Sequence, residues 1–256
     1  MTVLHLIGPA FLAKLTMINS NVARISGRDD AASPAVLQVD IIADLVCPWC
    51  YLGKRRLDDA LLAVHGPSSV NWYPFQLNPA MPETGMEFEE YLASKFGDPE
   101  ALQPALAQLT AAGAAEGITF RFDRIRHVPN TLNAHRVMKL AEAVGASPSG
   151  LAENILRGFF EEGLDISSRE VLLEVGSRSG LTEASINRTL DDDATRQTVL
   201  SQEAQVRRSG VTGVPDFLIN KRLFVIGAQS TASLVNVFDR AMFGEESDLP
   251  VSATIH

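Results

Sequence analysis

The two cysteines of this 256-residue chain lie close together, as Cys47-Pro48-Trp49-Cys50. An apolar strand pattern precedes them and an amphipathic helix pattern follows, so we expect the first cysteine at the first turn of a helix. A thiol there faces unpaired backbone N–H groups and the positive end of the helix dipole, and both favour the nucleophilic thiolate. The second thiol can attack a mixed disulfide formed on the first. The motif therefore predicts dithiol–disulfide exchange, with Cys47 as the nucleophile and Cys50 as the resolving thiol.

Cysteine content and charge exclude several other classes of protein. A secreted disulfide scaffold would carry more cysteines. A structural zinc site would need two further ligands at similar spacing, and the five histidines are not paired in that way. We therefore expect no bound metal, and no organic cofactor, because the electrons reside in the two sulfurs. The net charge of −9, without a dense basic run, argues against nucleic-acid binding.

Residues 1–34 are predicted to be a leader, either disordered or the product of a misassigned start. Its apolar part, Val3–Ala13, has about the length of a signal sequence core, but no positive residue precedes it and Gly8-Pro9 interrupts it. No stretch of about 20 apolar residues occurs, so no membrane span is expected. The cytoplasm is the favoured location. Export is the alternative, if residues 1–23 are a genuine signal peptide.

The apolar patterns change character along the chain. Strand, helix and strand patterns follow one another at the start, and strand patterns return only near the end, before a last helix. The intervening stretch is dominated by helical spacing. The expected strands are Leu37–Ile42, Val70–Phe75, Asp216–Asn220 and Leu223–Ile226; the expected helices of the long block are Phe88–Phe96, Leu102–Gly117, Thr131–Gly145, Leu151–Gly163, Ser168–Gly180, Thr182–Asp191 and Thr195–Gly210; the last helix is Thr231–Phe243.

This order predicts an α/β fold in which a β-α-β unit and a β-β-α unit build one sheet. Residues 35–81 form its first part and residues 209–243 its second part. Residues 82–208 form a large all-helical insertion that acts as a lid, and residues 244–256 form a disordered tail. The first strand is apolar on both faces and is therefore expected at the centre of the sheet.

Several segments together resemble a known family. They are Asp44–Arg56 (DLVCPWCYLGKRR), Pro74–Pro79 (PFQLNP), Pro129–His135 (PNTLNAH), Gly210–Pro215 (GVTGVP) and Gly227–Gln229 (GAQ). In this order they resemble the DsbA-like branch of the thioredoxin superfamily, and within it the FrnE-type oxidoreductases. The resemblance implies a thioredoxin-like fold interrupted by a helical domain.

The resemblance also implies a second functional element beside the cysteines. In the superfamily a cis proline faces the two thiols, so Val214-Pro215 is expected to be cis. Val214 would offer its backbone to an extended substrate, and the bulk of Pro215 would keep metals off the thiols. Trp49 would form an exposed apolar rim for substrates; the alternative is that it packs on the lid. Asp216 departs from the expected uncharged residue, and strand alternation should point it away from Pro215.

Proton acceptors for Cys50 are the next candidates. Enzymes of this kind often place a buried carboxylate on the first strand, and both Asp44 and Asp40 qualify, although either could be a solvated charge at the strand end. Asn130, Thr131 and His135 lie in a segment that is near the thiol in related isomerases and kappa-class glutathione transferases. Here the alternative is that Asn130 or Thr131 caps a helix and His135 is a core residue.

Two further groups of residues receive simpler interpretations. Phe75, Leu77 and Asn78 are candidates for lining the substrate cleft. The basic run Lys54–Arg56 is expected on a solvated helix face.

The favoured function is a thiol–disulfide oxidoreductase or disulfide isomerase acting on protein or small-molecule thiols and disulfides, as a monomer or homodimer, with glutathione or a protein thiol as the recycling partner. The alternative is a glutathione-dependent isomerase or transferase acting on a small aromatic or polyketide-like molecule, similar to 2-hydroxychromene-2-carboxylate isomerase. Those isomerases usually carry serine where Cys47 stands and lack the second cysteine. A non-enzymatic binder or chaperone would not need both sulfurs.

Overall fold

The computed structural model describes residues 36–97 and 102–243. The predicted leader (1–34) and tail (244–256) lie outside these residues. Within the described ranges, no helix is both long and apolar enough to cross a bilayer.

The main sheet has four strands in the order β2-β1-β5-β6. β1 (Leu37–Ala43) is central, with β2 (Ser68–Pro74) parallel on one side and β5 (Asp216–Ile219) antiparallel on the other. β6 (Leu223–Ile226) pairs antiparallel with β5 at the edge. The ends of the chain therefore build one sheet, as the sequence predicts, and the central position of β1 explains its two apolar faces.

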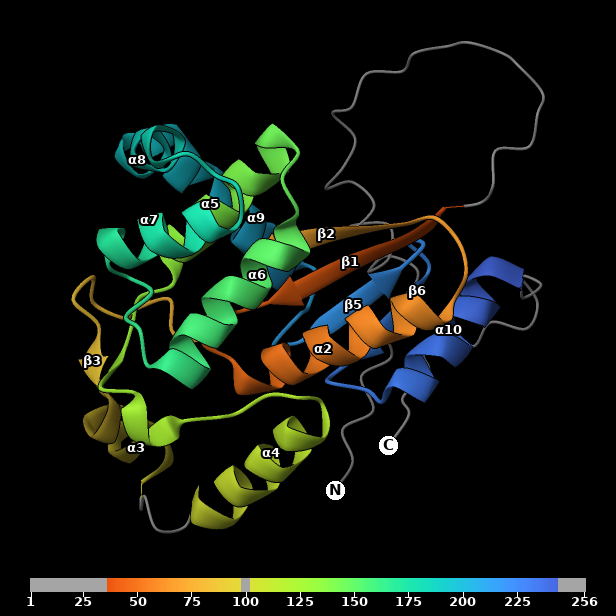
Figure 1. Cartoon of the computed structure of the whole chain (residues 1–256), viewed down its shortest axis with the longest axis horizontal. Helices are drawn as coiled ribbons and strands as arrows, with labels where there is room; N and C mark the ends of the chain where they lie inside the picture. Colours follow the sequence, from red (N-terminus) through yellow and green to blue (C-terminus); the bar gives the residue numbers. More distant parts are fainter. Residues whose placement is uncertain (1–35, 98–101, 244–256) are drawn as a thin grey trace.

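Two helices cover the face of the sheet that carries Ile41 and Phe217 (Figure 1). α2 (Pro48–Ala63) begins directly after the turn that follows β1, and Pro48 stands at its first position, where a missing N–H costs nothing. α10 (Thr231–Phe243) packs beside α2. This arrangement fixes the Cys47–Cys50 motif at the end of the central strand.

The insertion contains most of the remaining helices, on the other side of α2 from α10 (Figure 1). Their bounds lie within three residues of the predicted ranges at each end, when α6 is taken together with the π-helical turn that continues it to Glu162. They are α3 (Phe88–Phe96), α4 (Gln103–Ala115), α5 (Leu132–Val144), α6 (Pro148–Arg157), a π-helical turn over Gly158–Glu162, α7 (Arg169–Arg178), α8 (Glu183–Asp191) and α9 (Asp193–Arg208), with a short 3₁₀ turn at Phe122–Arg124.

The insertion is not entirely helical. β3 (Met86–Glu87) and β4 (His127–Val128) form a two-stranded antiparallel ladder. Two residues are too few to show the alternation that identifies a strand in a sequence, so this ladder was not predicted.

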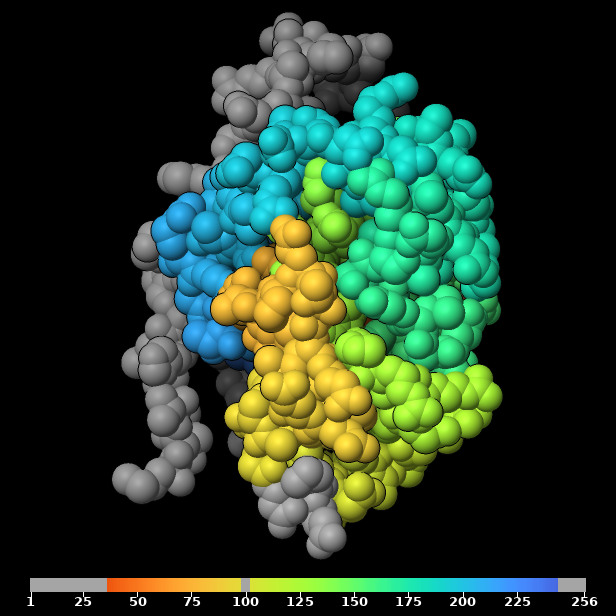
Figure 2. Space-filling model, turned by 90° about the vertical axis from the view of Figure 1, so that its left-hand side faces the viewer, coloured from red at the N-terminus to blue at the C-terminus, as the bar shows by residue number. Residues whose placement is uncertain are grey.

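The last helix of the insertion also packs on the sheet. Val206 of α9 joins Ile42, Tyr73 and Phe75 in a second apolar cluster, on the face opposite α2. Figure 2 shows the segment after β2, in orange and yellow, running between the light-blue α9 side and the green helices of the insertion. This segment therefore lies between α9 and the other helices of the insertion.

Candidate active site

The motif lies where β1 gives way to α2. Cys47 is the N-terminal cap residue of α2, and its carbonyl accepts hydrogen bonds from the N–H groups of Cys50 (3.0 Å) and Tyr51 (3.2 Å). The Cys47 thiol donates to the carbonyl oxygen of Val214 at 3.7 Å. The peptide bond between Val214 and Pro215 is cis. The fold thus brings together the helix terminus and the proline loop, which lie 167 residues apart in sequence.

Both sulfurs are recessed, although a turn ahead of a helix suggests an exposed thiol. Cys47 is 3% exposed and Cys50 is 0% exposed, whereas Trp49 between them is 47% exposed. The Val214 loop contacts Cys47 and contributes to its burial. Trp49 therefore stands at the surface, as the first of its two interpretations predicts, and marks the entrance to the thiols.

Gly53 allows the proline loop to approach α2 closely. A Cβ atom at this position would lie 3.0 Å from Cγ of Pro215 and 3.3 Å from the ring of Phe217. A side chain here would need Pro215 or Phe217 to move by a few tenths of an ångström, so Gly53 allows Pro215 to lie close to the first turns of α2.

Cys50 needs help to lose its proton. Burial is the main cause that raises the pKa of its thiol well above the usual value, and the hydrogen bond and charge of Cys47 raise it further. A hydrogen bond from the backbone of Asp44 acts in the opposite direction. At neutral pH Cys50 is therefore a thiol, and its attack on a mixed disulfide requires a base.

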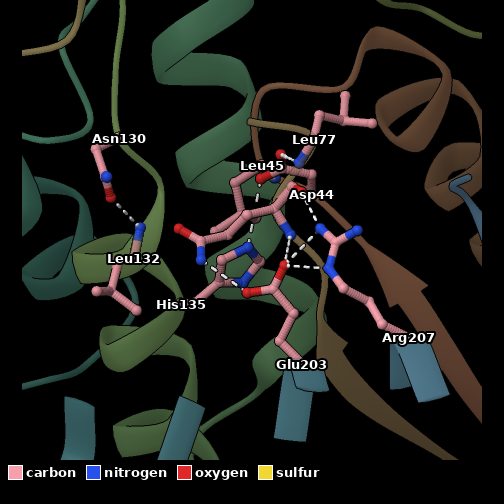
Figure 3. A network of polar contacts seen from close by, with 9 residues as sticks. Asp44, Leu45, Leu77, Asn130, Leu132, His135, Glu203 and Arg207 are labelled. Carbon is pink, nitrogen blue, oxygen red and sulfur yellow. Dashed lines mark hydrogen bonds and ion pairs between the residues drawn. The ribbon is translucent and has the colours of Figure 1, made fainter. Parts of the chain in front are cut away.

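Asp44 interacts with Cys50 and is almost completely buried. Figure 3 shows the polar contacts of its side chain. Its Oδ1 accepts from the N–H of Leu45 at 2.8 Å, and its Oδ2 accepts from the N–H of Leu77 at 2.7 Å. Nε2 of His135 lies 3.3 Å from Oδ1. Two predicted residues from distant segments thus meet in one buried pair.

Asp40, the other predicted acceptor, is engaged elsewhere. Its side chain accepts from Asn71 at 2.7 Å and lies 3.5 Å from Nζ of Lys221. Because Asp40 and Asp44 are both buried, neither is a solvated charge at the strand end.

A second buried network, which the sequence did not reveal, holds the segment after β2. Glu203 of α9 accepts from the backbone N–H and side-chain amide of Gln76, at 2.9 and 2.7 Å. Arg207 donates to Glu203 at 3.0 and 2.7 Å and also to the carbonyl of Gln76 (Figure 3). The only local signal was the i, i+4 spacing of Glu203 and Arg207, which is common on exposed helices. Since Gln76 precedes Leu77, this network anchors the N–H group that binds Asp44.

Asn130 and Thr131 serve the start of α5. Oδ1 of Asn130 accepts from the N–H of Leu132 at 2.9 Å, and its Nδ2 donates to the carbonyl of Met81 at 2.7 Å. Thr131 is the buried cap residue of α5, with no capping hydrogen bond from its side chain. These positions match the capping interpretation. His135 is buried as a core residue would be, but its imidazole also contacts the carboxylate of Asp44.

The residues predicted to line a cleft lie in different surroundings. Phe75 is buried beneath the guanidinium of Arg207, 4.0 Å from its ring centre, and is a core group. Leu77 is half-buried. Asn78 bonds to the hydroxyl of Tyr91 and to Nζ of Lys95 at 2.7 Å.

The prediction of a solvated face for Lys54–Arg56 is wrong. Lys54 is 4% exposed and pairs with Asp58 at 2.5 Å and with Glu153 of α6 at 2.6 Å. Arg55 also pairs with Glu153, and Arg56 pairs with Glu116 at 2.7 Å. Glu153 and Glu116 come from the insertion, so the sequence of α2 alone could not show that this face is covered.

Asp216 begins β5 and is buried on the sheet face opposite α2. Its register partner Ile42 belongs to the second apolar cluster, whereas the next residue, Phe217, faces α2. Burial raises the pKa of Asp216 from 3.8 to about 8, against the weaker effect of a hydrogen bond from the N–H of Gly227. The carboxyl is therefore protonated at neutral pH.

Replacing Asp216 with asparagine should change how stability depends on pH. Between the unfolded pKa of 3.8 and the folded pKa of about 8, the folded state holds one proton more than the unfolded state. This group therefore lowers the free energy of unfolding by about 1.4 kcal/mol per pH unit as the pH rises through that window. Asp216→Asn removes this slope. In urea unfolding, the free energy of unfolding of the variant relative to that of the wild type should therefore increase from pH 4 to pH 8. Parallel pH profiles for the two proteins would contradict the assignment.

Metal binding has no evident site in the part of the chain that the structure describes. No group of three His, Cys, Asp or Glu side chains there could hold a metal ion.

Comparisons with known proteins agree with this architecture. A probable DsbA oxidoreductase from Streptomyces coelicolor is 29% identical, with a TM-score of 0.74 over 84% of this chain and 93% of that one. The cytosolic disulfide reductase DsbM from Pseudomonas aeruginosa is 20% identical, with a TM-score of 0.56 over 80% and 95% of the two chains. The Bacillus subtilis protein YwbO is 23% identical over 212 residues, which cover 82% of this chain and 98% of YwbO. Residues 38–239 match the DSBA-like thioredoxin domain, and the chain belongs to that family.

Proposed function

We propose that this protein is a thiol–disulfide oxidoreductase of the FrnE type that uses Cys47 and Cys50 as its redox pair. The observation that carries the proposal is the position of Cys47, which caps α2 and contacts the carbonyl of Val214 beside the cis proline. At this position the sulfur faces the unpaired N–H groups of a helix terminus, and the thiolate is the attacking species in disulfide exchange.

The proposed reaction has two steps. Cys47 attacks a substrate disulfide, forms a mixed disulfide and releases one substrate thiol. Cys50 then attacks Sγ of Cys47, the bond between Cys47 and the substrate breaks, and the second substrate thiol leaves. Two electrons pass from the dithiol to the substrate, and the same steps in reverse oxidise a substrate dithiol.

Substrate binding is proposed to use the groups around the entrance. An extended substrate segment would hydrogen-bond to the backbone of Val214, while exposed Trp49 would contact its apolar side chains. Glutathione is the proposed recycling thiol. A DsbM structure that contains glutathione has the same fold, with a TM-score of 0.51 at 19% identity.

Insulin reduction in the presence of dithiothreitol tests the proposal. The wild type should accelerate precipitation of the insulin chains well above the uncatalysed rate, because the proposed exchange at Cys47 adds a catalysed route. Cys47→Ala is the matched control and should not differ from dithiothreitol alone. Equal rates for the wild type and Cys47→Ala would reject the oxidoreductase function.

A further inference from the structure

The pair formed by Asp44 and His135 joins the redox domain to the insertion. Asp44 follows β1, His135 lies in α5, and 91 residues separate them in sequence. Their side chains are 1% and 4% exposed, and Nε2 of His135 is 3.3 Å from Oδ1 of Asp44. Figure 3 shows the imidazole directed at the carboxylate. A contact of this kind between two titratable groups is shielded from solvent screening.

The remaining contacts of Asp44 hold its carboxylate in place. Two backbone N–H groups, those of Leu45 and Leu77, donate to its two oxygens. A carboxylate has about four lone-pair sites, so His135 takes a third and one site is left. Of the hydrogen bonds that the described residues make to this carboxylate, the contact with His135 comes from a titratable side chain and the other two come from the backbone.

Cys50 lies against the same residue. Its thiol is fully buried and hydrogen-bonds to the backbone of Asp44, and the charge of Asp44 opposes its ionisation. A proton that leaves Cys50 therefore enters surroundings in which the adjacent titratable groups are Cys47 and the Asp44–His135 pair.

We propose that the buried Asp44–His135 pair accepts the proton of Cys50 in the second step of the exchange, with His135 sharing that proton through its contact with the Asp44 carboxylate. This inference rests on the proposed function. The proton passes from Cys50 to the pair, the Cys50 thiolate attacks Sγ of Cys47, and the bond between Cys47 and the substrate sulfur breaks. The substrate leaves as a thiolate that takes a proton from water, while the enzyme dithiol becomes the disulfide.

Glu203, Arg207 and Arg136, the other charged groups near the Asp44–His135 pair, form hydrogen bonds with other partners. α9, which packs against α5, contributes Glu203 and Arg207, and these bind each other and Gln76. α2 contributes the two cysteines. On α5 itself, Arg136 donates to the carbonyls of Thr189 and Asp192, away from Asp44.

The test separates the two chemical steps by rapid mixing of the reduced enzyme with oxidised glutathione, acid quenching and mass spectrometry. His135→Gln keeps a hydrogen-bond donor but cannot take up a proton. Formation of the mixed disulfide should stay within about twofold of the wild type, because Cys47 is untouched. The second step should slow by about 10²-fold or more at pH 7, because acid–base catalysis typically contributes about 10²–10⁴-fold.

The pH profile distinguishes this role from a structural one. Without the pair, ionisation of Cys50 depends on hydroxide, so the second step of His135→Gln should accelerate about tenfold per pH unit between pH 6 and 9. The wild type should depend on pH less steeply. Arg136→Gln is the matched control, since it loosens the neighbouring contacts of α5 without touching Asp44, and it should retain the wild-type profile.

Three outcomes would overturn the inference. In the first, the wild type exchanges thiols normally, and both His135→Gln and Arg136→Gln show the same rate and pH profile for the second step as the wild type. Another is a wild type that forms no mixed disulfide, which rejects the proposed function and this inference with it. If His135→Gln does not fold, nitrogen NMR of the wild type replaces it: the Nε2 resonance of His135 should differ between the dithiol and disulfide forms, and identical shifts would be the third contrary result.

Discussion

Replacing Cys50 with serine is expected to stop multiple turnover and to trap the substrate on Cys47. In the proposed reaction the neighbouring thiol in α2 attacks the mixed disulfide within one molecule, and well-oriented groups of this kind reach effective concentrations of about 10⁵ M or more. An external thiol at millimolar concentration cannot replace it, so exchange should fall by at least about 10³-fold. Insulin reduction measures the loss, and mass spectrometry without reductant should show the retained substrate.

This variant also separates the two enzyme classes that the sequence left open. A glutathione-dependent isomerase needs one nucleophilic position and no second sulfur, so its turnover should survive Cys50→Ser. Cys47→Ser is the companion variant, because it removes the attacking sulfur and should form no mixed disulfide at all. If Cys50→Ser kept the full rate of insulin reduction, Cys50 could not be the resolving thiol.

The largest loss of stability is expected for Glu203→Ala. This buried carboxylate accepts four hydrogen bonds, two from Gln76 and two from Arg207. Its removal leaves the buried donors of Gln76 and one guanidinium without their acceptor, at a cost of about 3 kcal/mol or more. Urea unfolding should show a lower midpoint with an unchanged slope.

Glu83→Ala provides the control for this loss. Glu83 also pairs with an arginine, Arg196 at 3.5 Å, but its side chain is 84% exposed. Such a surface pair contributes less than about 1 kcal/mol. Equal destabilisation by the two substitutions would show that the buried network contributes no more to stability than an exposed ion pair.

Local sequence signals predicted the elements and the redox motif well. The cap at Cys47, the proline at the first helical position and the alternation in β1 depend on residues a few positions apart. Helical spacing likewise placed the helices of the insertion close to their observed bounds. The cis proline, in contrast, could be expected only from the family resemblance. No short-range pattern distinguishes it from a trans proline that begins a strand.

Contacts between distant segments were the part that the sequence could not supply. Lys54 is a helix-surface residue by its pattern, and only the arrival of Glu153 explains its burial. Nothing in the neighbourhood of Asp44 indicates that an imidazole from α5 reaches it. The recessed position of Cys47 also depends on Val214, which arrives from the far end of the chain.

The depth of the Cys47 sulfur has a consequence for the choice of clients. With Cys47 3% exposed and Trp49 47% exposed, the proposed exchange should favour a disulfide on a thin, pliable stretch of chain, because a bulky folded surface would meet the indole of Trp49 first. Bridges that are already enclosed within a finished protein would therefore be spared. Loose, immature or damaged chains would be preferentially processed through shape alone, without any recognition of their sequence.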